Sequence, residues 1–365
     1  MQYFGVYNED FMTENLEQSA DQASPFTRLR ALMFLVGTVI VGVLVIVLIT
    51  WWVIGSAPRA TAIVIDETIT VSEYITLPDD DSYPASLAIA SDGTLYTGSY
   101  KTGVVWSITS DGVITELTDT RDRIGAVSGL EVAPDGTLII LDRIDALDAL
   151  GAIIWRYADG ELSSLVEIPY DDRNGVVLPD DITVDGAGFI YMTDRDPARV
   201  LRYTPDGLNQ ELWWTPTMAL DGTIDAPTGL AYDALNDAIL ITGSNQDSIY
   251  RVSATSVDLS DALNKTELLY ADTATNGYSF DGITVTASGD IYVALLNWNR
   301  VARLDGNTLV MLARDFRGAS DVAYDADKDA LIVTNWNQFS LGFGTSPQLP
   351  FALDILDLSP EIVTE

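Results

Sequence analysis

Two aspartates, Asp180 in the run LPDDITV and Asp281 in the run FDGITV, stand at equivalent points of a repeated pattern and are the strongest candidates for chemistry. Such a carboxylate pair can hold a hard cation such as Ca²⁺, with the amide carbonyl of Asn297 as a further ligand. Either carboxylate can also serve as a general base. The sequence has no cysteine and no histidine, which excludes thiolate and imidazole ligands and a Ser-His-Asp triad. We therefore predict a site of oxygen ligands, with Ca²⁺ as its candidate cofactor.

The charge of the chain excludes one class of partner. Its 54 acidic and 19 basic residues give a formal net charge of −35 at pH 7. A surface this acidic repels the phosphate backbone of nucleic acids, so we expect no nucleic-acid partner.

Six copies of one pattern of short strands must position the candidate residues. Each copy has an apolar strand, a turn that is often Asp-Gly, a second strand ending in small or polar residues, and a third strand. The copies cover residues 87–100, 130–143, 182–195, 230–245, 283–299 and 322–337. Repeats of about 40–50 residues with several strands each are typical of β-propellers. We predict an all-β, six-bladed β-propeller; a β-sandwich, the alternative, does not explain the regular repeat.

The predicted propeller spans residues 68–358 and is followed by a tail, residues 359–365. The sixth copy has no clear fourth strand, whereas the strand-like segment 68–77 precedes the first copy and has no blade of its own. We expect this segment to complete blade six and so join the ends of the ring.

Strand direction places the candidate site at one end of the central channel. In an antiparallel blade, the start of the first strand and the end of the second lie on the same face. Besides the two aspartates and Asn297, we place at this channel mouth Ser128, Thr228, Asn245, Trp298, Ser320, Asn335 and Trp336, with Tyr100, Arg143 and Arg195 also at second-strand ends. This ring predicts a small-molecule site; the alternative is a solvated opening whose aspartates cap turns.

The segment 338–351 interrupts blade six on the same face and is apolar, with Gly and Pro residues. We predict that it is a loop that forms a lid or a docking surface for a membrane-protein partner.

An apolar run before the propeller predicts one membrane span. Residues 31–54 carry no charge, and a helix of this length would cover ~36 Å, enough for a bilayer core of ~30 Å. Arg28 and Arg30 precede the run and Arg59 follows it, which favours a cytoplasmic N-terminus. We expect a cytoplasmic tail (1–30), a span (31–54), a linker (55–67) and an extracytoplasmic propeller on the cytoplasmic membrane. A cleaved signal peptide is the alternative, although its apolar region is usually only ~7–15 residues long.

The motifs YPASLAIASDGTLYTGSY, LPDDITVDGAGFIYMTDR and FDGITVTASGDIYVALLNWNRVARLDG resemble those of a known superfamily. They are similar to the six-bladed propellers of the gluconolactonase, senescence-marker-protein and strictosidine-synthase-like proteins, and more loosely to NHL repeats. With its anchor, the chain also looks like the adipocyte plasma-membrane-associated protein branch. The resemblance covers residues 68–358 and implies the fold, while the superfamily includes hydrolases, a condensing enzyme and non-enzymes.

The resemblance also implies where a divalent ion would bind. Metal-dependent gluconolactonases hold it with a Glu in blade one, Asn in blades three and four, and Asp in blade five. The matching positions here are Ala85, Asp180, Thr228 and Asp281, so only two carboxylates of the four ligands are present. This departure puts a tight lactonase-type metal site in doubt.

Three functions follow from these observations. The first is a non-catalytic binding or scaffold module outside the cytoplasmic membrane, acting as a subunit or partner of a membrane complex. The alternative is a Ca²⁺-dependent lactone or ester hydrolase that uses Asp281 or Asp180. The third, a strictosidine-synthase-like condensing enzyme, needs a distinct acid at the channel mouth, and no residue stands out for this role.

Overall fold

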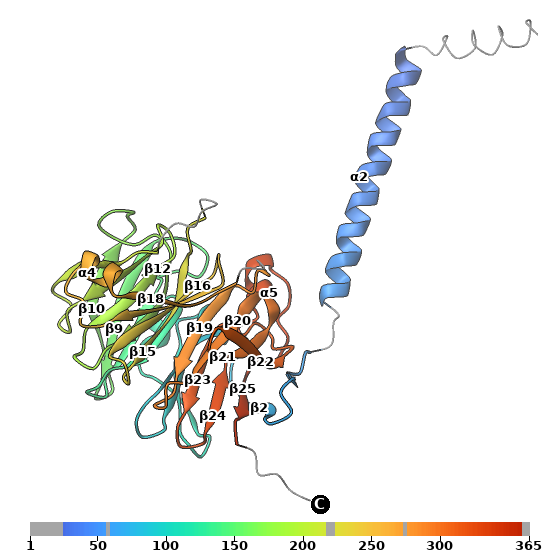
Figure 1. The fold of residues 1–365 in the computed structure, drawn as a ribbon. Helices are drawn as coiled ribbons and strands as arrows, with labels where there is room; N and C mark the ends of the chain where they lie inside the picture. The colour runs from blue at the N-terminus through green and yellow to red at the C-terminus, as the bar shows by residue number, and fades with distance from the viewer. Residues whose placement is uncertain (1–24, 56–58, 217–222, 273–275, 360–365) are drawn as a thin grey trace, which may run out of the picture. The chain divides into compact units, whose positions relative to one another are not determined.

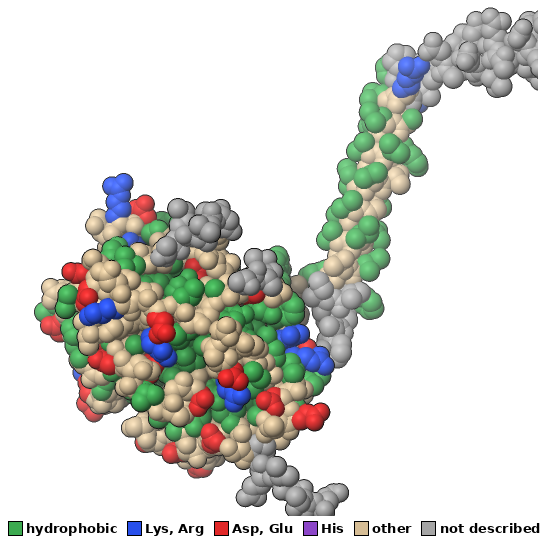
Figure 2. All heavy atoms as spheres, viewed as in Figure 1, with side chains coloured by type: hydrophobic (Ala, Val, Ile, Leu, Met, Phe, Trp, Pro, Cys, Tyr) green, Lys and Arg blue, Asp and Glu red, His purple; other side chains and the backbone are tan. Residues whose placement is uncertain are grey.

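The computed structural model describes residues 25–55, 59–216, 223–272 and 276–359, which divide into two compact units, Met1–Pro58 and Arg59–Glu365. The first unit contains helix α2 (Pro25–Gly55). It begins before the apolar run because Leu29 and Arg30 are good helix formers. Its stretch Arg28–Trp52 is long and apolar enough to cross a membrane, as an anchor or as an N-terminal signal sequence. Figure 2 shows hydrophobic side chains along this helix.

The second unit is a ring of six antiparallel sheets, the blades (Figure 1). Blade one contains β3 (Pro84–Ile89), β4 (Leu95–Ser99), β5 (Val105–Ile108) and β6 (Ile114–Glu116). Blade two contains β7 (Val127–Val132), β8 (Leu138–Asp142), β9 (Gly151–Ala158) and β10 (Glu161–Pro169). Blade three contains β11 (Pro179–Val184), β12 (Ile190–Asp194), β13 (Arg199–Tyr203) and β14 (Gln210–Trp214).

The remaining blades follow the same order. Blade four contains β15 (Pro227–Asp233), β16 (Ala238–Gly243), β17 (Ser248–Ser253) and β18 (Thr266–Ala271). Blade five contains β19 (Phe280–Val285), β20 (Ile291–Leu295), β21 (Arg300–Asp305) and β22 (Thr308–Arg314). Blade six contains β23 (Val322–Asp325), β24 (Ala330–Val333) and β25 (Ala352–Asp357). Short helices lie in the connections: α3 (Thr120–Arg123), α4 (Leu259–Asn264), η1 (Leu296–Trp298) and α5 (Gln338–Phe343).

The chain before blade one adds one strand to blade five and one strand to blade six. Strand β2 (Thr70–Thr76) pairs with β25 and supplies the fourth strand of blade six. Strand β1 (Ile63–Val64) pairs with β22 as a fifth strand of blade five. The segment 55–67, expected as a linker, therefore contains a strand, because Ala62 and Val64 pack on the core and the edge of β22 offers free backbone groups.

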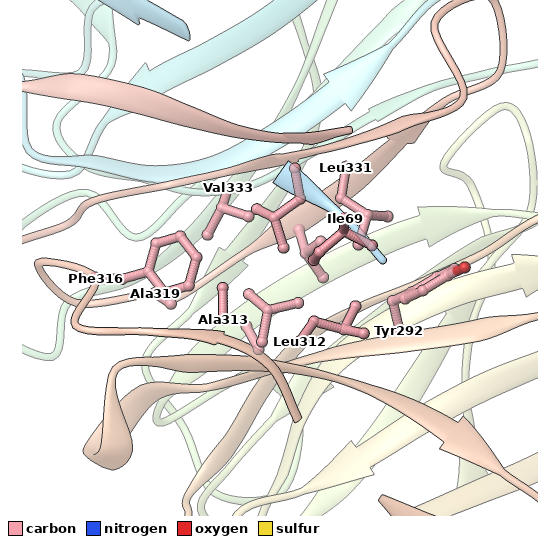
Figure 3. Close-up of a cluster of buried hydrophobic side chains, with 12 residues drawn as sticks. Ile69, Tyr292, Leu312, Ala313, Phe316, Ala319, Leu331 and Val333 are labelled. Atoms are coloured by element: carbon pink, nitrogen blue, oxygen red, sulfur yellow. The ribbon is translucent and has the colours of Figure 1, made fainter. Parts of the chain in front are cut away.

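Apolar side chains between adjacent blades form the core. In the cluster between blades five and six, Leu312 and Phe316 face Leu331 and Val333, and Ile69 joins them from the segment before β2 (Figure 3). Each of these five side chains is almost completely buried. Neighbouring blades thus cover faces that no single blade could bury alone.

The segment 338–351 is not entirely a loop as predicted. Its first residues form α5, which begins after Asn337 and ends at Gly344, both in left-handed backbone conformations. Leu341 packs against the core cluster of blades one and six. Ser340 is buried, and its hydroxyl hydrogen-bonds to Asn337 O at 2.9 Å and to the Tyr83 hydroxyl at 3.1 Å. These contacts explain why a Gly-punctuated segment becomes helical.

Candidate functional site

A β-bulge near the start of five innermost strands sets the geometry of the channel mouth. The register shifts near the first residues of β3, β7, β11, β15 and β19. A bulge turns two consecutive side chains toward the same side of a strand. Both Asp180 and Asp181 therefore reach the channel from blade three, instead of only one of them.

The mouth cavity, as we call the space at this end of the channel, has a volume of about 30 Å³ and is lined by Ala85, Tyr100, Ser128, Asp180, Asp181, Gly229, Asp281, Gly282, Ser320, Asp321 and Trp336. This volume suffices for a water molecule or for one polar group of a larger ligand. Six of the predicted residues thus converge here: Tyr100, Ser128, Asp180, Asp281, Ser320 and Trp336.

Arg195 does not line the mouth cavity but lies beside it, next to Asp180. Its guanidinium Nη1 lies 3.6 Å from Asp180 Oδ1. The charges of Asp180 and Asp281 raise the pKa of Arg195. Burial, followed by the charge of Asp180, raises the pKa of Asp281 well above its ordinary value, although Arg195 opposes this shift. Asp281 therefore binds and releases its proton at a higher pH than an exposed aspartate does.

Several buried polar atoms around the mouth cavity have no hydrogen-bond partner in the described part of the chain. They are Ser128 Oγ, Asp180 Oδ2, Arg195 Nε and Trp336 Nε1. Buried polar groups are normally satisfied, and each exception calls for an explanation. Two donors, one acceptor and one hydroxyl gathered around one cavity point to a polar ligand or water.

Tyr100 forms a further wall of the cavity. Arg143 donates a hydrogen bond to its hydroxyl, and its ring packs edge-on against Trp336 with centroids 4.9 Å apart. Burial raises the pKa of Tyr100 to about 12, so that the neutral phenol is retained at physiological pH. Of the three predicted second-strand ends, Tyr100 lines the cavity, and Arg143 reaches it only through this hydrogen bond.

The other predicted mouth residues have different roles. Thr228 donates to Phe280 O at 2.8 Å, and Asn335 accepts from Arg317 N at 2.7 Å, so both are buried links between backbone segments. Asn245, Asn297 and Trp298 are exposed and do not line the mouth cavity. The short helix η1 turns the chain aside after β20, which removes Asn297 from the expected metal site and places its Nδ2 3.4 Å from Gly277 O.

The predicted set lacks two carboxylates that divide the channel. Asp181 of blade three and Asp321 of blade six line both the mouth cavity and a second chamber of about 300 Å³ below it. Asp181 accepts from Leu230 N at 2.7 Å, and Asp321 accepts from Leu87 N at 2.7 Å. Each carboxylate thus ties its blade to the next one.

Glycines make room for these bonds. A Cβ at Gly282 would collide with Asp321, and a Cβ at Gly229 would collide with the backbone of Asp281. At this level the innermost strands carry either an aspartate or a small residue: Ser86, Gly129, Asp181, Gly229, Gly282 and Asp321. This pattern is the sequence signal that could have identified the two carboxylates.

Calcium was expected here, and the donor set fits it poorly. Ca²⁺ takes six to eight oxygen ligands, whereas Thr228 is bonded elsewhere, Ala85 has no side-chain oxygen and Asn297 lies outside the cavity. Among the residues that the structure describes, no three acidic side chains are grouped as metal ligands. Arg195 already supplies a positive charge beside Asp180. The residues around the mouth cavity therefore do not fit a Ca²⁺ ion.

Buried carboxylates in the channel make stability depend on pH. Burial raises the pKa of Glu131, in the second chamber, and that of Asp321 to about 7. Since these groups bind protons more tightly when folded than when unfolded, their protonation stabilises the fold. This contribution is complete below pH ~4 and is lost as the pH rises to about 7.

We expect the urea midpoint of wild type to be higher at pH 5.5 than at pH 8. In Glu131→Gln the pH dependence should fall by about 1–3 kcal/mol, because the variant lacks this titration. The comparison is made in 0.5 M salt, which screens the surface charge but not the buried groups. An unchanged pH dependence in the variant would refute the assignment.

Aspartates at the ends of second strands, and one just before a first strand, bind the backbone of the loops around the channel mouth. Asp142 accepts from Ala126 N at 3.0 Å, Asp194 from Leu178 N at 2.7 Å and Asp225 from Asn245 N at 3.0 Å. The turn-capping interpretation therefore applies to these residues. It does not apply to Asp281, because this residue lines the mouth cavity.

The sequence matches no protein-family model and no curated protein. Among solved structures, a gluconolactonase from Xanthomonas campestris is 17% identical, with a TM-score of 0.57 over 83% of this chain and 95% of that one. The fold is a six-bladed β-propeller, similar to that of the gluconolactonase structure. The predicted fold and the predicted resemblance are thereby confirmed.

Two further propeller structures have similar scores. A luciferin-regenerating enzyme is 14% identical, with a TM-score of 0.58 over 79% of this chain and 95% of that one. A virginiamycin B lyase from Staphylococcus aureus, catalytically inactive through a histidine-to-alanine substitution and in complex with quinupristin, is 17% identical, with a TM-score of 0.53 over 80% and 99%. At these identities the likeness concerns the fold alone.

Proposed function

We propose that the mouth cavity binds the carbonyl group of a small polar ligand and that the chain hydrolyses a lactone or a related ester there. The observation that carries this proposal is the set of unpartnered polar atoms, Ser128 Oγ, Asp180 Oδ2, Arg195 Nε and Trp336 Nε1, around one cavity that also holds Asp281. The gluconolactonase gives this class of activity as fold-level analogy.

In the proposed reaction, Asp281 is the general base. Its raised pKa brings it nearer to the operating pH, where proton transfer is most efficient. It takes a proton from water as the water oxygen attacks the carbonyl carbon. Arg195 and Trp336 carry the N–H donors that would stabilise the negative oxygen formed in that step. The ring bond of the lactone then breaks, and the leaving oxygen receives the proton.

This chemistry needs no histidine. The inactive variant of the virginiamycin B lyase lacks one histidine side chain, whereas this chain has no histidine at all. Any activity here must therefore depend on other groups, and the carboxyl, guanidinium and indole around the mouth cavity are the candidates.

We further propose that α2 anchors the propeller as a single span on the extracytoplasmic side of the cytoplasmic membrane. Its apolar stretch Arg28–Trp52 and the flanking arginines support this orientation. A non-catalytic module in a membrane complex is the second candidate function, because the blade-one ligand position is Ala85 and α5 exposes two phenylalanines.

The decisive experiment is a turnover assay of the full chain in detergent with a panel of lactones and esters, in EDTA and in Ca²⁺. We expect equal turnover in both conditions, since Arg195 is the resident cation. A specific Ca²⁺ ion at 100 times its Kd would instead stabilise wild type by about 2.7 kcal/mol. Ca²⁺-dependent turnover, with this stabilisation lost in Asp281→Asn, would favour the metal-dependent hydrolase. Ligand binding without turnover would favour the non-catalytic module.

A further inference from the structure

Helix α5 presents an aromatic pair that no part of the described propeller covers. Phe339 and Phe343 are 72% and 74% exposed, and their rings stack with centroids 5.7 Å apart. They lie one helical turn apart, while Leu341 on the opposite side packs into the core. The helix is therefore anchored by one face and offers the other.

The sequence segment that carries this pair lacks charge. No charged residue occurs between Asp329 and Asp354, although the whole chain carries −35. The half-exposed Leu349 follows in the same segment. An uncharged apolar projection on an acidic protein can approach a surface that would repel the rest of the molecule.

The polypeptide that follows α2 enters the propeller beside this segment. Arg59 Nη2 donates to Pro350 O at 2.9 Å, and Ala60 N donates to Gln348 Oε1 at 2.5 Å. Ile63 then pairs with Arg314, at the end of β22 that lies on the face of the channel mouth. The chain therefore enters on the same face as the mouth cavity and α5.

Only a short stretch of sequence separates this point from the end of α2. Three residues, 56–58, join Gly55 to Arg59, and four extended peptide units cover at most about 14 Å. If α2 spans a membrane, Arg59 and the 348–350 backbone to which it is bonded must lie near the bilayer surface.

We propose that α5 docks on the lipid bilayer, with Phe339 and Phe343 in its interfacial layer, so that the channel mouth faces the membrane. Aromatic side chains on a short amphipathic segment suit the boundary between headgroups and acyl chains. The proposal rests on the membrane span proposed above and is independent of the chemistry proposed for the mouth cavity.

The absence of cysteine from the sequence allows a direct test. Phe343→Cys in the full chain is labelled with a polarity-sensitive fluorophore and reconstituted in phosphatidylcholine vesicles. The matched control is Leu235→Cys, whose side chain is 63% exposed in the turn between β15 and β16 at the other end of the blades. Quenching by a nitroxide lipid and by aqueous iodide is measured at both positions.

We expect the label at position 343 to be quenched by the nitroxide lipid and shielded from iodide at least about threefold relative to position 235. Phe339→Ser should reduce this difference. Equal access of iodide to both positions, in vesicles that retain the protein after alkaline extraction, would overturn the proposal. Shielding that appears only at high protein-to-lipid ratio would indicate a second copy instead, and would overturn it too. Loss of the protein on alkaline extraction would remove the span on which the proposal rests, without bearing on turnover.

Discussion

Replacement of Asp281 by asparagine should lower kcat about 10²- to 10⁴-fold, the usual contribution of a positioned general base. The amide cannot accept the proton of the attacking water, yet it has the size of the carboxylate. The backbone of residue 281 keeps its bond from Thr242 Oγ1 at 2.6 Å. Ligand affinity should therefore change little, and the loss should appear in kcat rather than in KM.

The same variant should be slightly more stable than wild type at pH 7.5. Burial and the charge of Asp180 disfavour the ionised carboxylate of Asp281, so its removal relieves an unfavourable interaction of about 1 kcal/mol. Asp305→Asn, at an exposed strand end, is the control and should alter neither property. A variant that keeps full turnover, or that unfolds more easily, would show that Asp281 is structural.

The pH profile gives an independent readout of the same assignment. Activity should rise with pH through the raised pKa of Asp281, because the base must be ionised. In Asp180→Asn the profile should shift to lower pH, since the charge of Asp180 is one cause of the raised pKa. An unshifted profile would mean that another group is titrating.

The fold could be predicted from the sequence because its signals are local and repeated. Alternating strands and Asp-Gly turns recur in every blade, and blade stacking is the solution that buries them. The outermost strands carry weaker signals: β6 is half-exposed or exposed throughout, and β1 has only two residues. Their positions depend on partners far away in the sequence.

The candidate site could be predicted only in part. Asp180 and Asp281 follow from strand direction, but Asp181 and Asp321 do not, because regular alternation would turn them away from the channel. The bulges that bring Asp181 inward are a property of the assembled blade. Asn297 is expected at the mouth because the repeat places second-strand ends there. Helix η1 and the left-handed backbone of Asn299 instead turn the chain away from the mouth at this point.

The second large effect is expected at Arg199, whose substitution by methionine should destabilise the propeller by about 3–5 kcal/mol. Arg199 is 8% and Asp194 0% exposed in their side chains, and Nη2 lies 2.8 Å from Oδ2. The same guanidinium donates to Asp172 O at 3.0 Å and to Gly175 O at 2.8 Å. Methionine would leave a buried carboxylate without its cation and two carbonyls without a donor. Chemical denaturation measures the loss.

The control for this prediction is Lys265→Met, which breaks the exposed pair of Lys265 with Asp261 and should cost less than about 0.5 kcal/mol. The double variant Asp194→Asn/Arg199→Met should recover part of the loss, because burial raises the pKa of Asp194 even beside Arg199. Burying the ionised Asp194–Arg199 pair therefore costs free energy. The neutral pair of side chains in the double variant avoids this cost. A double variant as unstable as Arg199→Met alone would instead assign the loss to the two carbonyls.

This cycle also bears on the site, because Asp194 Oδ1 accepts from Val177 N at 3.1 Å and Leu178 N at 2.7 Å, just before Asp180. Asparagine at 194 retains an oxygen acceptor for these bonds, whereas a buried unpaired carboxylate in Arg199→Met favours rearrangement of the segment. We therefore expect the double variant to keep turnover close to wild type and Arg199→Met to lose it beyond its unfolded fraction. Equal specific activity of the folded fraction in both variants would show that the position of Asp180 does not depend on this bond.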